Sequence, residues 1–160
     1  MATKMTPLVV NGTCLGAVRD YDADSVGING VSVKALATVN GLIINVHGFK
    51  EFMISVAIDN TGGGAAGLAS LRINTYDEAG VAMLTDFDLV TAINLKADNT
   101  VTVAFGFGNT AKLHYTSGTP VLSSNADILR GVARMRCSIV TTEASNGTTV
   151  TAIVKVRAQA

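Results

Sequence analysis

Apolar residues recur at every second position in several stretches of the chain. The pattern runs through residues 52–58, 71–74 and 100–107. Alternation of this kind is typical of a β-strand that has one face in the core and the other exposed. Helical spacing is weak and confined to residues 87–93 and to a short capped turn at 124–129. We therefore expect an all-β protein with at most short helices.

Turn signals separate these stretches, and the strongest is the dipeptide Asn-Gly. It occurs four times, as Asn11-Gly12, Asn29-Gly30, Asn40-Gly41 and Asn146-Gly147. Asn followed by Gly tolerates the two positive φ angles of a type I′ turn, so each dipeptide predicts a β-hairpin. Many short antiparallel strands joined by such turns indicate an antiparallel β-sandwich of jelly-roll type. We expect one domain over residues 1–160, with 1–12 as a candidate N-terminal arm.

A turn at Asn146-Gly147 would pair the last two strands in a defined register. Cys137 would then face Val156, and Arg136 would lie directly opposite Arg157. The side chains predicted to point into the core are Cys137, Ile139, Val154 and Val156, and those predicted to point outward are Arg134, Arg136, Lys155 and Arg157. Like charges directly opposed are destabilising, so we expect acidic residues to lie against this basic face. The acidic turn with Asp20, Asp22 and Asp24 is the first candidate.

Composition narrows the classes of function. Of the 160 residues 48% are hydrophobic and 15% are charged, which argues against disorder. Twelve basic residues balance twelve acidic ones, so a dedicated binder of nucleic acid or of a membrane surface is not expected. The sequence shows neither a signal-peptide h-region nor an apolar stretch long enough to span a membrane. We expect a soluble protein that is made in the cytoplasm.

Two motifs resemble ligand-binding loops. Residues 62–67 match G-x-G-x-x-G, but a dinucleotide site needs a helix after the loop, and residues 68–76 alternate like a strand. Asp20-x-Asp22-x-Asp24 resembles the start of a calcium loop, yet Val31 stands where an EF-hand has its bidentate Glu. A looser calcium site at the acidic turn remains an alternative to a solvated turn.

Catalytic and metal-binding patterns are weak. His47 and His114 have no evident Ser or Cys partner in the sequence, and the four Cys and His residues are too scattered for a zinc site. We therefore expect no catalytic residue, metal or cofactor. Cys14 and Cys137 fit two buried thiols, with a single disulfide as the alternative. Tyr21, Tyr76 and Tyr115 are the only aromatic candidates for stacking on a sugar, because the chain has no Trp.

One segment carries a resemblance to a known group of proteins. Residues 46–63 read Val-His-Gly-Phe-Lys, then an alternating strand, then Asp-Asn-Thr-Gly-Gly. This resembles a segment of bacteriophage head-decoration and other small virion β-sandwich proteins, in which a V-x-G-[YF]-K corner leads into a strand and an x-N-T-G-G turn. Residues 71–80 look like the next strand and acidic-Gly turn of that group, and 132–137 like its Arg-bearing closing strand.

The resemblance implies a non-enzymatic virion protein that is made in the host cytoplasm. It would form homo-oligomers and pack on major capsid or tail proteins as a decoration or cement component. The alternative is a carbohydrate- or ligand-binding β-sandwich of the lectin or adhesin type. The residues expected at interfaces come from the arm, the acidic turn and the basic face: Lys4, Met5, Asp20, Asp22, Asp24, Arg134, Arg136, Lys155 and Arg157.

Overall fold

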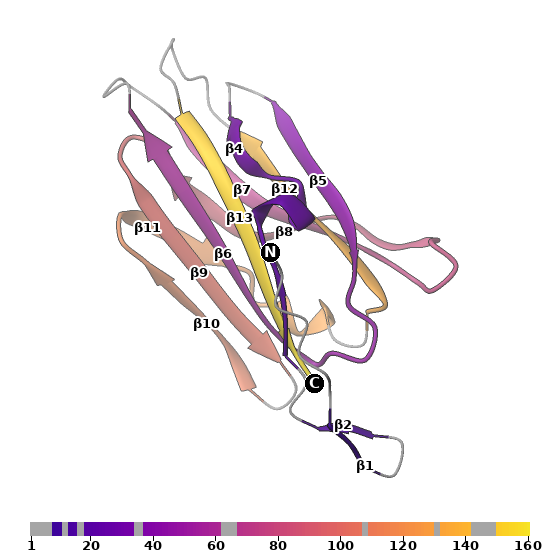
Figure 1. Cartoon of the computed structure of the whole chain (residues 1–160). Helices are drawn as coiled ribbons and strands as arrows, with labels where there is room; N and C mark the ends of the chain where they lie inside the picture. Colours follow the sequence, from indigo (N-terminus) through magenta and orange to yellow (C-terminus); the bar gives the residue numbers. More distant parts are fainter. Residues whose placement is uncertain are drawn as a thin grey trace.

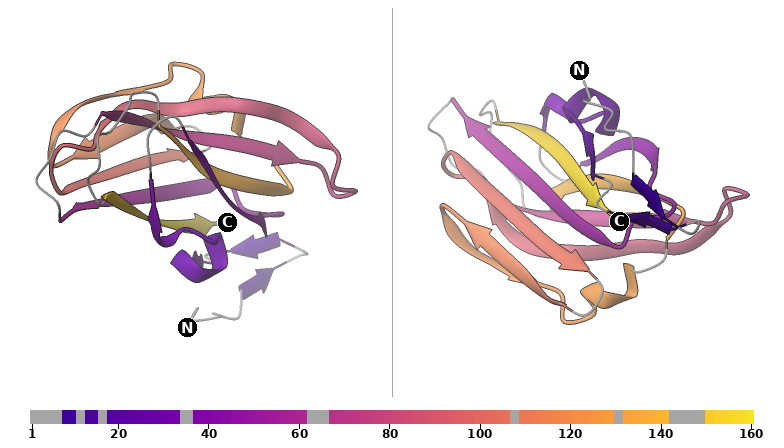
Figure 2. Two further views of the ribbon diagram at one scale, coloured as in Figure 1. Left: turned by 90° about the horizontal axis from the view of Figure 1, so that it is seen from above. Right: turned by 60° about the horizontal axis from the view of Figure 1, so that its bottom comes forward.

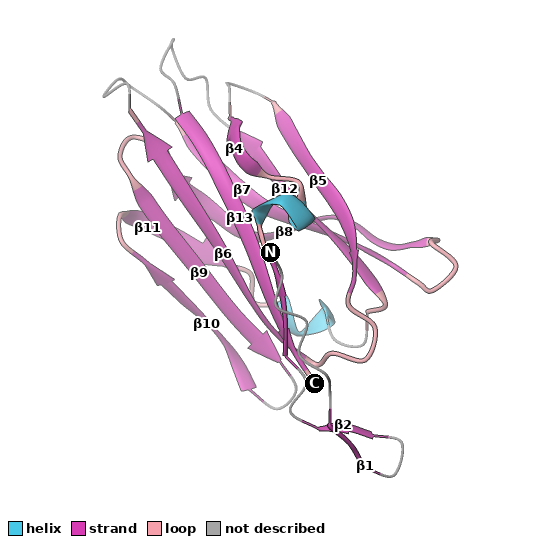
Figure 3. Ribbon diagram, viewed as in Figure 1, coloured by secondary structure: helices cyan, strands magenta, loops and turns pink. Residues whose placement is uncertain are grey.

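The computed structural model describes residues 8–10, 13–15, 18–33, 37–61, 67–106, 109–129, 132–141 and 150–160. Strands dominate this part of the chain, and its two helices are four residues long each (Figure 3). In chain order the elements are β1 (Leu8–Val10), β2 (Thr13–Leu15), β3 (Val18–Tyr21), α1 (Ala23–Val26), β4 (Asn29–Ser32), β5 (Thr38–Asn45), β6 (Glu51–Asn60), β7 (Leu68–Tyr76), β8 (Ala82–Asn94), β9 (Asn99–Gly106), β10 (Asn109–Tyr115), β11 (Gly118–Leu122), η1 (Ala126–Leu129), β12 (Arg134–Thr141) and β13 (Val150–Gln159). No described helix has the length and apolar character needed to cross a membrane.

Two antiparallel sheets pack face to face (Figures 1 and 2). Sheet 1 has the order β10-β9-β6-β13-β3, with β4 also paired to β13, and sheet 2 has the order β11-β8-β7-β12-β5. If β3 and β4 count as one strand and the outer strands β10 and β11 are set aside, eight strands remain. Their orders are then 1-8-3-6 in sheet 1 and 2-7-4-5 in sheet 2, which is the jelly-roll arrangement. The expected fold class is confirmed.

The core lies between the two sheets and is made by the alternating apolar positions. On β6 these are the four predicted residues, all at most 3% exposed: Phe52, Ile54, Val56 and Ile58. The facing sheet contributes Leu71 and Ile73 from β7, both fully buried. The period-two reading of these strands is therefore correct.

The prediction that the last two strands pair as a hairpin is wrong, but the prediction of which side chains face the core is correct. β12 pairs with β5 and β7, whereas β13 pairs with β6, β3 and β4, so the two strands belong to opposite sheets. The four residues predicted to face the core, Cys137, Ile139, Val154 and Val156, are at most 1% exposed. The alternation within each strand fixes which side chains are buried, whichever strand lies beside it. Asn146-Gly147 lies outside the described residues.

Two of the other Asn-Gly dipeptides lie inside strands and not at hairpin turns. Asn29-Gly30 begins β4, where Gly30 has a φ of 64° and the register with β13 shifts. Asn40-Gly41 lies within β5, at a register shift against β12. The same tolerance for unusual backbone angles that suits a turn also suits a β-bulge. β1 and β2 do form the pair expected around Asn11-Gly12, with Val10 opposite Thr13, although the dipeptide itself lies outside the described residues.

Bulges also explain the weak helical spacing of Phe87, Val90 and Ile93. All three residues belong to β8, whose register against β7 shifts four times. Asp86 and Ala92 on this strand have positive φ angles of 55° and 56°. Each bulge adds a residue to one strand, so core positions fall three apart where two would be normal.

The glycine-rich segment is followed by a strand. Residues 62–66 lie outside the described residues, and β7 begins at Leu68. No helix N-terminus follows the loop, so it lacks the element that holds a dinucleotide pyrophosphate.

Candidate assembly surfaces

The acidic turn meets the basic residues of β13 within the chain. Asp20 on β3 pairs in register with Arg157 on β13, and the Nε atom of Arg157 lies 2.9 Å from the Oδ1 atom of Asp20. This confirms that Asp20 compensates a basic residue, and it corrects the predicted opposition of Arg136 and Arg157. Both side chains are about half exposed, so the pair adds at most about 1 kcal/mol to stability.

The other two carboxylates of the turn hold local structure. Asp22 is the N-cap of α1: its Oδ1 atom accepts hydrogen bonds from the backbone N–H of Ser25 at 2.9 Å and from the Ser25 hydroxyl at 2.7 Å. These hydrogen bonds stabilise the ionised form and lower the pKa of the Asp22 carboxyl. Asp24 accepts a 2.8 Å hydrogen bond from the side-chain amide of Asn29. Within the described residues no three His, Cys, Asp or Glu side chains gather in a way that could hold a metal ion, so the calcium alternative gains no support.

The basic C-terminal face is two separate surfaces. Arg134 and Arg136 lie on the outer face of sheet 2, whereas Lys155 and Arg157 lie on the outer face of sheet 1. This division follows from the assignment of β12 and β13 to opposite sheets. Lys155 is exposed. Of the predicted interface residues, Lys4 and Met5 lie outside the described residues.

Arg134 and Arg136 have no carboxylate partner in the described part of the chain. The guanidinium carbon of Arg136 lies 6.0 Å from the centre of the Tyr76 ring. The Nε atom of Arg136 is buried and makes no hydrogen bond. A buried donor without an acceptor lowers the stability of the folded protein by about 1–3 kcal/mol, and by more when it is charged. Such a donor calls for an explanation.

The neighbouring Arg72 on β7 shows the opposite situation. Its Nε atom lies 2.7 Å from Oδ1 of Asp88, and its Nη1 atom lies 3.4 Å from Oδ1 of Asp86. The hydrogen bond to Asp88 is the main cause of the raised pKa of Arg72. On this part of sheet 2, Arg72 is therefore paired with carboxylates, whereas Arg134 and Arg136 are not.

Four exposed apolar residues on β5 and the β7–β8 hairpin were not anticipated from the sequence. Leu42 and Ile43 lie on β5, and Val81 and Met83 lie at the tip of the β7–β8 hairpin, all more than half exposed. The tip is a tight turn in which the Asp77 carboxylate accepts a 2.7 Å hydrogen bond from the Val81 N–H. Alternation in the sequence predicts to which side of a strand each side chain points, but it does not predict whether another element covers that side. The run Val81-Ala-Met-Leu84 after an acidic-Gly turn was the available signal.

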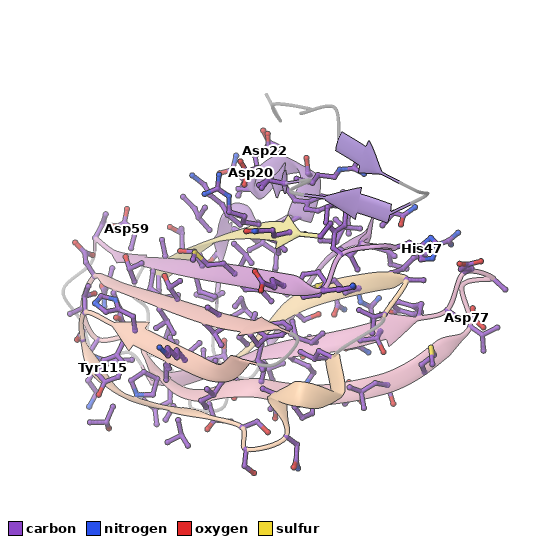
Figure 4. The ribbon with its side chains drawn as sticks, turned by 90° about the horizontal axis from the view of Figure 1, so that it is seen from below. Asp20, Asp22, His47, Asp59, Asp77 and Tyr115 are labelled. Carbon is purple, nitrogen blue, oxygen red and sulfur yellow. The ribbon has the colours of Figure 1, made fainter. Side chains whose placement is uncertain are left out.

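The tyrosines do not form a sugar-binding platform. Tyr21 is 4% exposed, and its hydroxyl donates to the backbone carbonyl of Asn45. Burial is the main cause of its raised pKa. Tyr76 lies on β7, and Tyr115 is exposed on β10 in the other sheet. Figure 4 shows Tyr115 and the hairpin residue Asp77 at opposite ends of the molecule.

Two candidate groups remain, a cysteine in the core and a histidine beside the hairpin tip. Cys137 carries a free thiol in the core and so forms no disulfide. Burial raises the pKa of this thiol to about 12. His47, in the turn between β5 and β6, has its Nε2 atom 3.0 Å from Oε1 of Glu78 near the hairpin tip, and both side chains are exposed.

Comparison with known proteins gives similarities in fold. No family model matches the chain, and no curated protein matches it. Among solved structures, a T=1 particle derived from infectious bursal virus has a TM-score of 0.51 at 11% identity, over 90% of this chain and 31% of its own. The structure of infectious bursal disease virus Gx strain has a TM-score of 0.53 at 14% identity, over 96% of this chain and 36% of its own. The VP2 subviral particle of the same virus has a TM-score of 0.52 at 12% identity, over 90% of this chain and 32% of its own.

A metal-free lectin I-B4 from Griffonia simplicifolia has a TM-score of 0.43 at 9% identity, which is too low to carry an argument. The chain spans about a third of the length of the viral capsid proteins that it matches. At these identities the similarity is one of fold. The chain shares the β-sandwich of these virus-particle proteins over nine-tenths or more of its own length.

Proposed function

We propose that the chain is a structural, non-catalytic protein of a virus particle, which self-associates and packs on a capsid or tail as a decoration or cement component. The observation that carries this proposal is the jelly-roll strand order together with a fold shared with virus-particle proteins over at least 90% of the chain. A fold alone does not establish a function, so the surface has to supply the rest of the argument.

The described surface offers features suited to contact with other chains. Exposed apolar side chains lie on β5 and at the β7–β8 tip, beside two arginines without carboxylate partners. The β1–β2 hairpin belongs to neither large sheet, and Figure 1 places it beyond their ends, close to the C-terminus. Its sequence from Leu8 to Leu15 has no charged residue. An isolated two-stranded hairpin is marginally stable in water, so a neighbouring chain would stabilise it.

The lectin-like alternative has less support. A sugar platform would need aromatic or acidic side chains gathered at one end of the sandwich, and the described tyrosines are divided between the two sheets or buried.

The test is binding of the purified chain to heads and, separately, to tails of the parent virus that lack this protein. We expect co-sedimentation that saturates at a fixed number of copies per particle. Particles that already carry their full complement of the protein are the matched control and should bind no more. If the chain binds neither heads nor tails, the proposed role on a particle is overturned.

A further inference from the structure

Exposed apolar side chains are concentrated on one part of sheet 2. The described residues include seven large hydrophobic side chains that are exposed, and four of them lie on β5 and the β7–β8 hairpin tip. Met83 at the tip is 69% exposed. Single exposed apolar residues are ordinary, but a group of them on one sheet marks an interaction surface. Here β12 lies between β5 and the β7–β8 hairpin.

The strand register connects these residues across the outer face of sheet 2. Arg136 lies between Ile43 on β5 and Asn74 on β7. In the next row Arg134 lies between Asn45 and Tyr76, and Tyr76 pairs with Ala82 at the start of β8. The rows thus run from the exposed edge of β5 to the base of the hairpin, which projects beyond the body of the sandwich in Figures 1 and 4.

The edge strand of this surface is approached by α1 at the bulge around Gly41. β5 is the last strand of sheet 2, and its eight residues include neither a charged residue nor a proline. Natural edge strands usually carry such residues, which prevent association with other chains. The bulge and α1 protect part of this edge within the chain, so the contact between copies is assigned to the outer face of the sheet and not to strand pairing.

The sheet and the hairpin tip of this surface carry opposite charges. The sheet carries Arg134 and Arg136 without carboxylate partners, and the Arg136 Nε atom is buried without an acceptor. The hairpin tip carries Glu78, which is 73% exposed and pairs with His47. One copy therefore presents cations on its sheet and an anion with two apolar side chains on its tip.

A surface that carries both of the groups that form a contact is suited to a dimer with twofold symmetry. Residue i of one copy then meets residue j of the other copy, and residue j of the first meets residue i of the second. We propose that two copies of this chain associate through this surface, with the tip of each hairpin against the outer face of sheet 2 in the other. Glu78, Val81 and Met83 of each copy lie against Ile43, Arg134 and Arg136 of its partner. The inference rests on the self-association in the proposed function and specifies where it occurs.

The first test compares two exposed methionines by sedimentation velocity over a range of concentrations. Met83→Ser should raise the dimer dissociation constant about tenfold or more, as expected for an apolar residue at the centre of a contact. Met53→Ser is the matched control, because Met53 is 45% exposed on the outer face of sheet 1. It should leave the dissociation constant within about twofold of the wild type. Unchanged thermal unfolding of both variants would show that they fold.

The second test is a charge exchange. Arg134→Glu and Glu78→Arg should each weaken the dimer, and the double variant should recover most of the lost affinity, because Arg134 and Glu78 form no ion pair within one copy. Lys155→Glu, on the outer face of sheet 1, is the control and should have no effect.

The outcomes separate this inference from the proposed function. If the wild type is monomeric at all concentrations, both the twofold contact and the self-association are overturned. If the wild type associates, but Met83→Ser behaves like Met53→Ser and the double variant shows no recovery, only the assignment of the surface is overturned. Association with recovery, but without binding to heads or tails, would support the contact and overturn the role on a particle.

Discussion

Burial decides what each side chain contributes in this protein. Leu71 on β7 is fully buried between the sheets, whereas Leu42 on β5 is 59% exposed. The two residues have the same chemistry, so a comparison between them isolates the effect of position.

We expect Leu71→Ala to lower the free energy of unfolding by about 2–5 kcal/mol, because it removes buried methyl groups and leaves a cavity. Leu42→Ala should change it by about 0.5 kcal/mol or less. Urea unfolding followed by circular dichroism measures both. Equal losses in the two variants would show that Leu71 is not part of a packed core.

Asp22 links the protonation of one carboxylate to the start of α1. Its pKa is lowered from the ordinary value of 3.8, chiefly by the hydrogen bonds from Ser25. The stabilisation from this lowered pKa is fully present above 3.8, and it is lost as the pH falls through the lower value of the folded state.

We therefore expect Asp22→Ala to lower the melting temperature at pH 7 and to have a smaller effect at about pH 2.5. Asp22→Asn keeps an oxygen acceptor for the cap and should cost less than Asp22→Ala at pH 7. Thermal unfolding at the two pH values measures these differences. A loss in Asp22→Ala that is the same at both pH values would contradict the role of the carboxylate charge.

The strands of this protein depart from regularity where other elements come close. At Gly41, in the middle of β5, a Cβ atom would lie 2.5 Å from the carbonyl oxygen of Val26 and 2.8 Å from that of Cys137. Both are backbone atoms, which cannot move away as the end of a side chain could. The bulge at Asn40-Gly41 thus lets α1 approach the edge of sheet 2.

We expect Gly41→Ala to destabilise the protein by about 1–3 kcal/mol, the usual range for overpacking. Gly48→Ala is a useful comparison, because its added Cβ would meet nothing within 4 Å and its strain comes from a φ of 85° alone. Chemical unfolding of both variants separates close contact from backbone strain. If Gly41→Ala is as stable as the wild type, the contact with Val26 is not as close as described.

The arrangement of the complete jelly roll separates the β1–β2 hairpin from the two large sheets. The pairing of β13 with β3 and β4 joins the last strand to the first ones of the sandwich. β1 and β2 pair only with each other among the described strands. Stability of the sandwich and contact through the hairpin should therefore be separable.

Deletion of residues 1–15 should leave the melting temperature nearly unchanged but lower the occupancy of particles that lack the protein. The first effect follows because, among the described strands, β1 and β2 pair only with each other. The second follows because a neighbouring chain is expected to hold the hairpin in the assembly. Binding by wild-type and shortened protein is compared on the same particles, and equal occupancy would remove the hairpin from the mechanism.

The alternation of residues along the chain was enough to predict the strands and their buried faces. Phe52, Ile54, Cys137 and Val154 lie in the core as predicted, because side chains on a strand point alternately to its two sides whatever the neighbouring strand is. The prediction that acidic residues lie near the basic ones was correct for Asp20 and Arg157. The buried faces depend on local sequence, whereas the contact between Asp20 and Arg157 depends on the pairing of β3 with β13.

The choice of partners between strands was decided by the folded chain. β12 and β13 alternate equally well as a hairpin or as members of opposite sheets, since backbone hydrogen-bonding groups are the same along every strand. Only the packing of the two sheets assigns Arg136 to one outer face and Arg157 to the other. It also brings Ile43, Arg136 and the β7–β8 tip onto one surface, because non-local pairing of β5, β12 and β7 places them side by side.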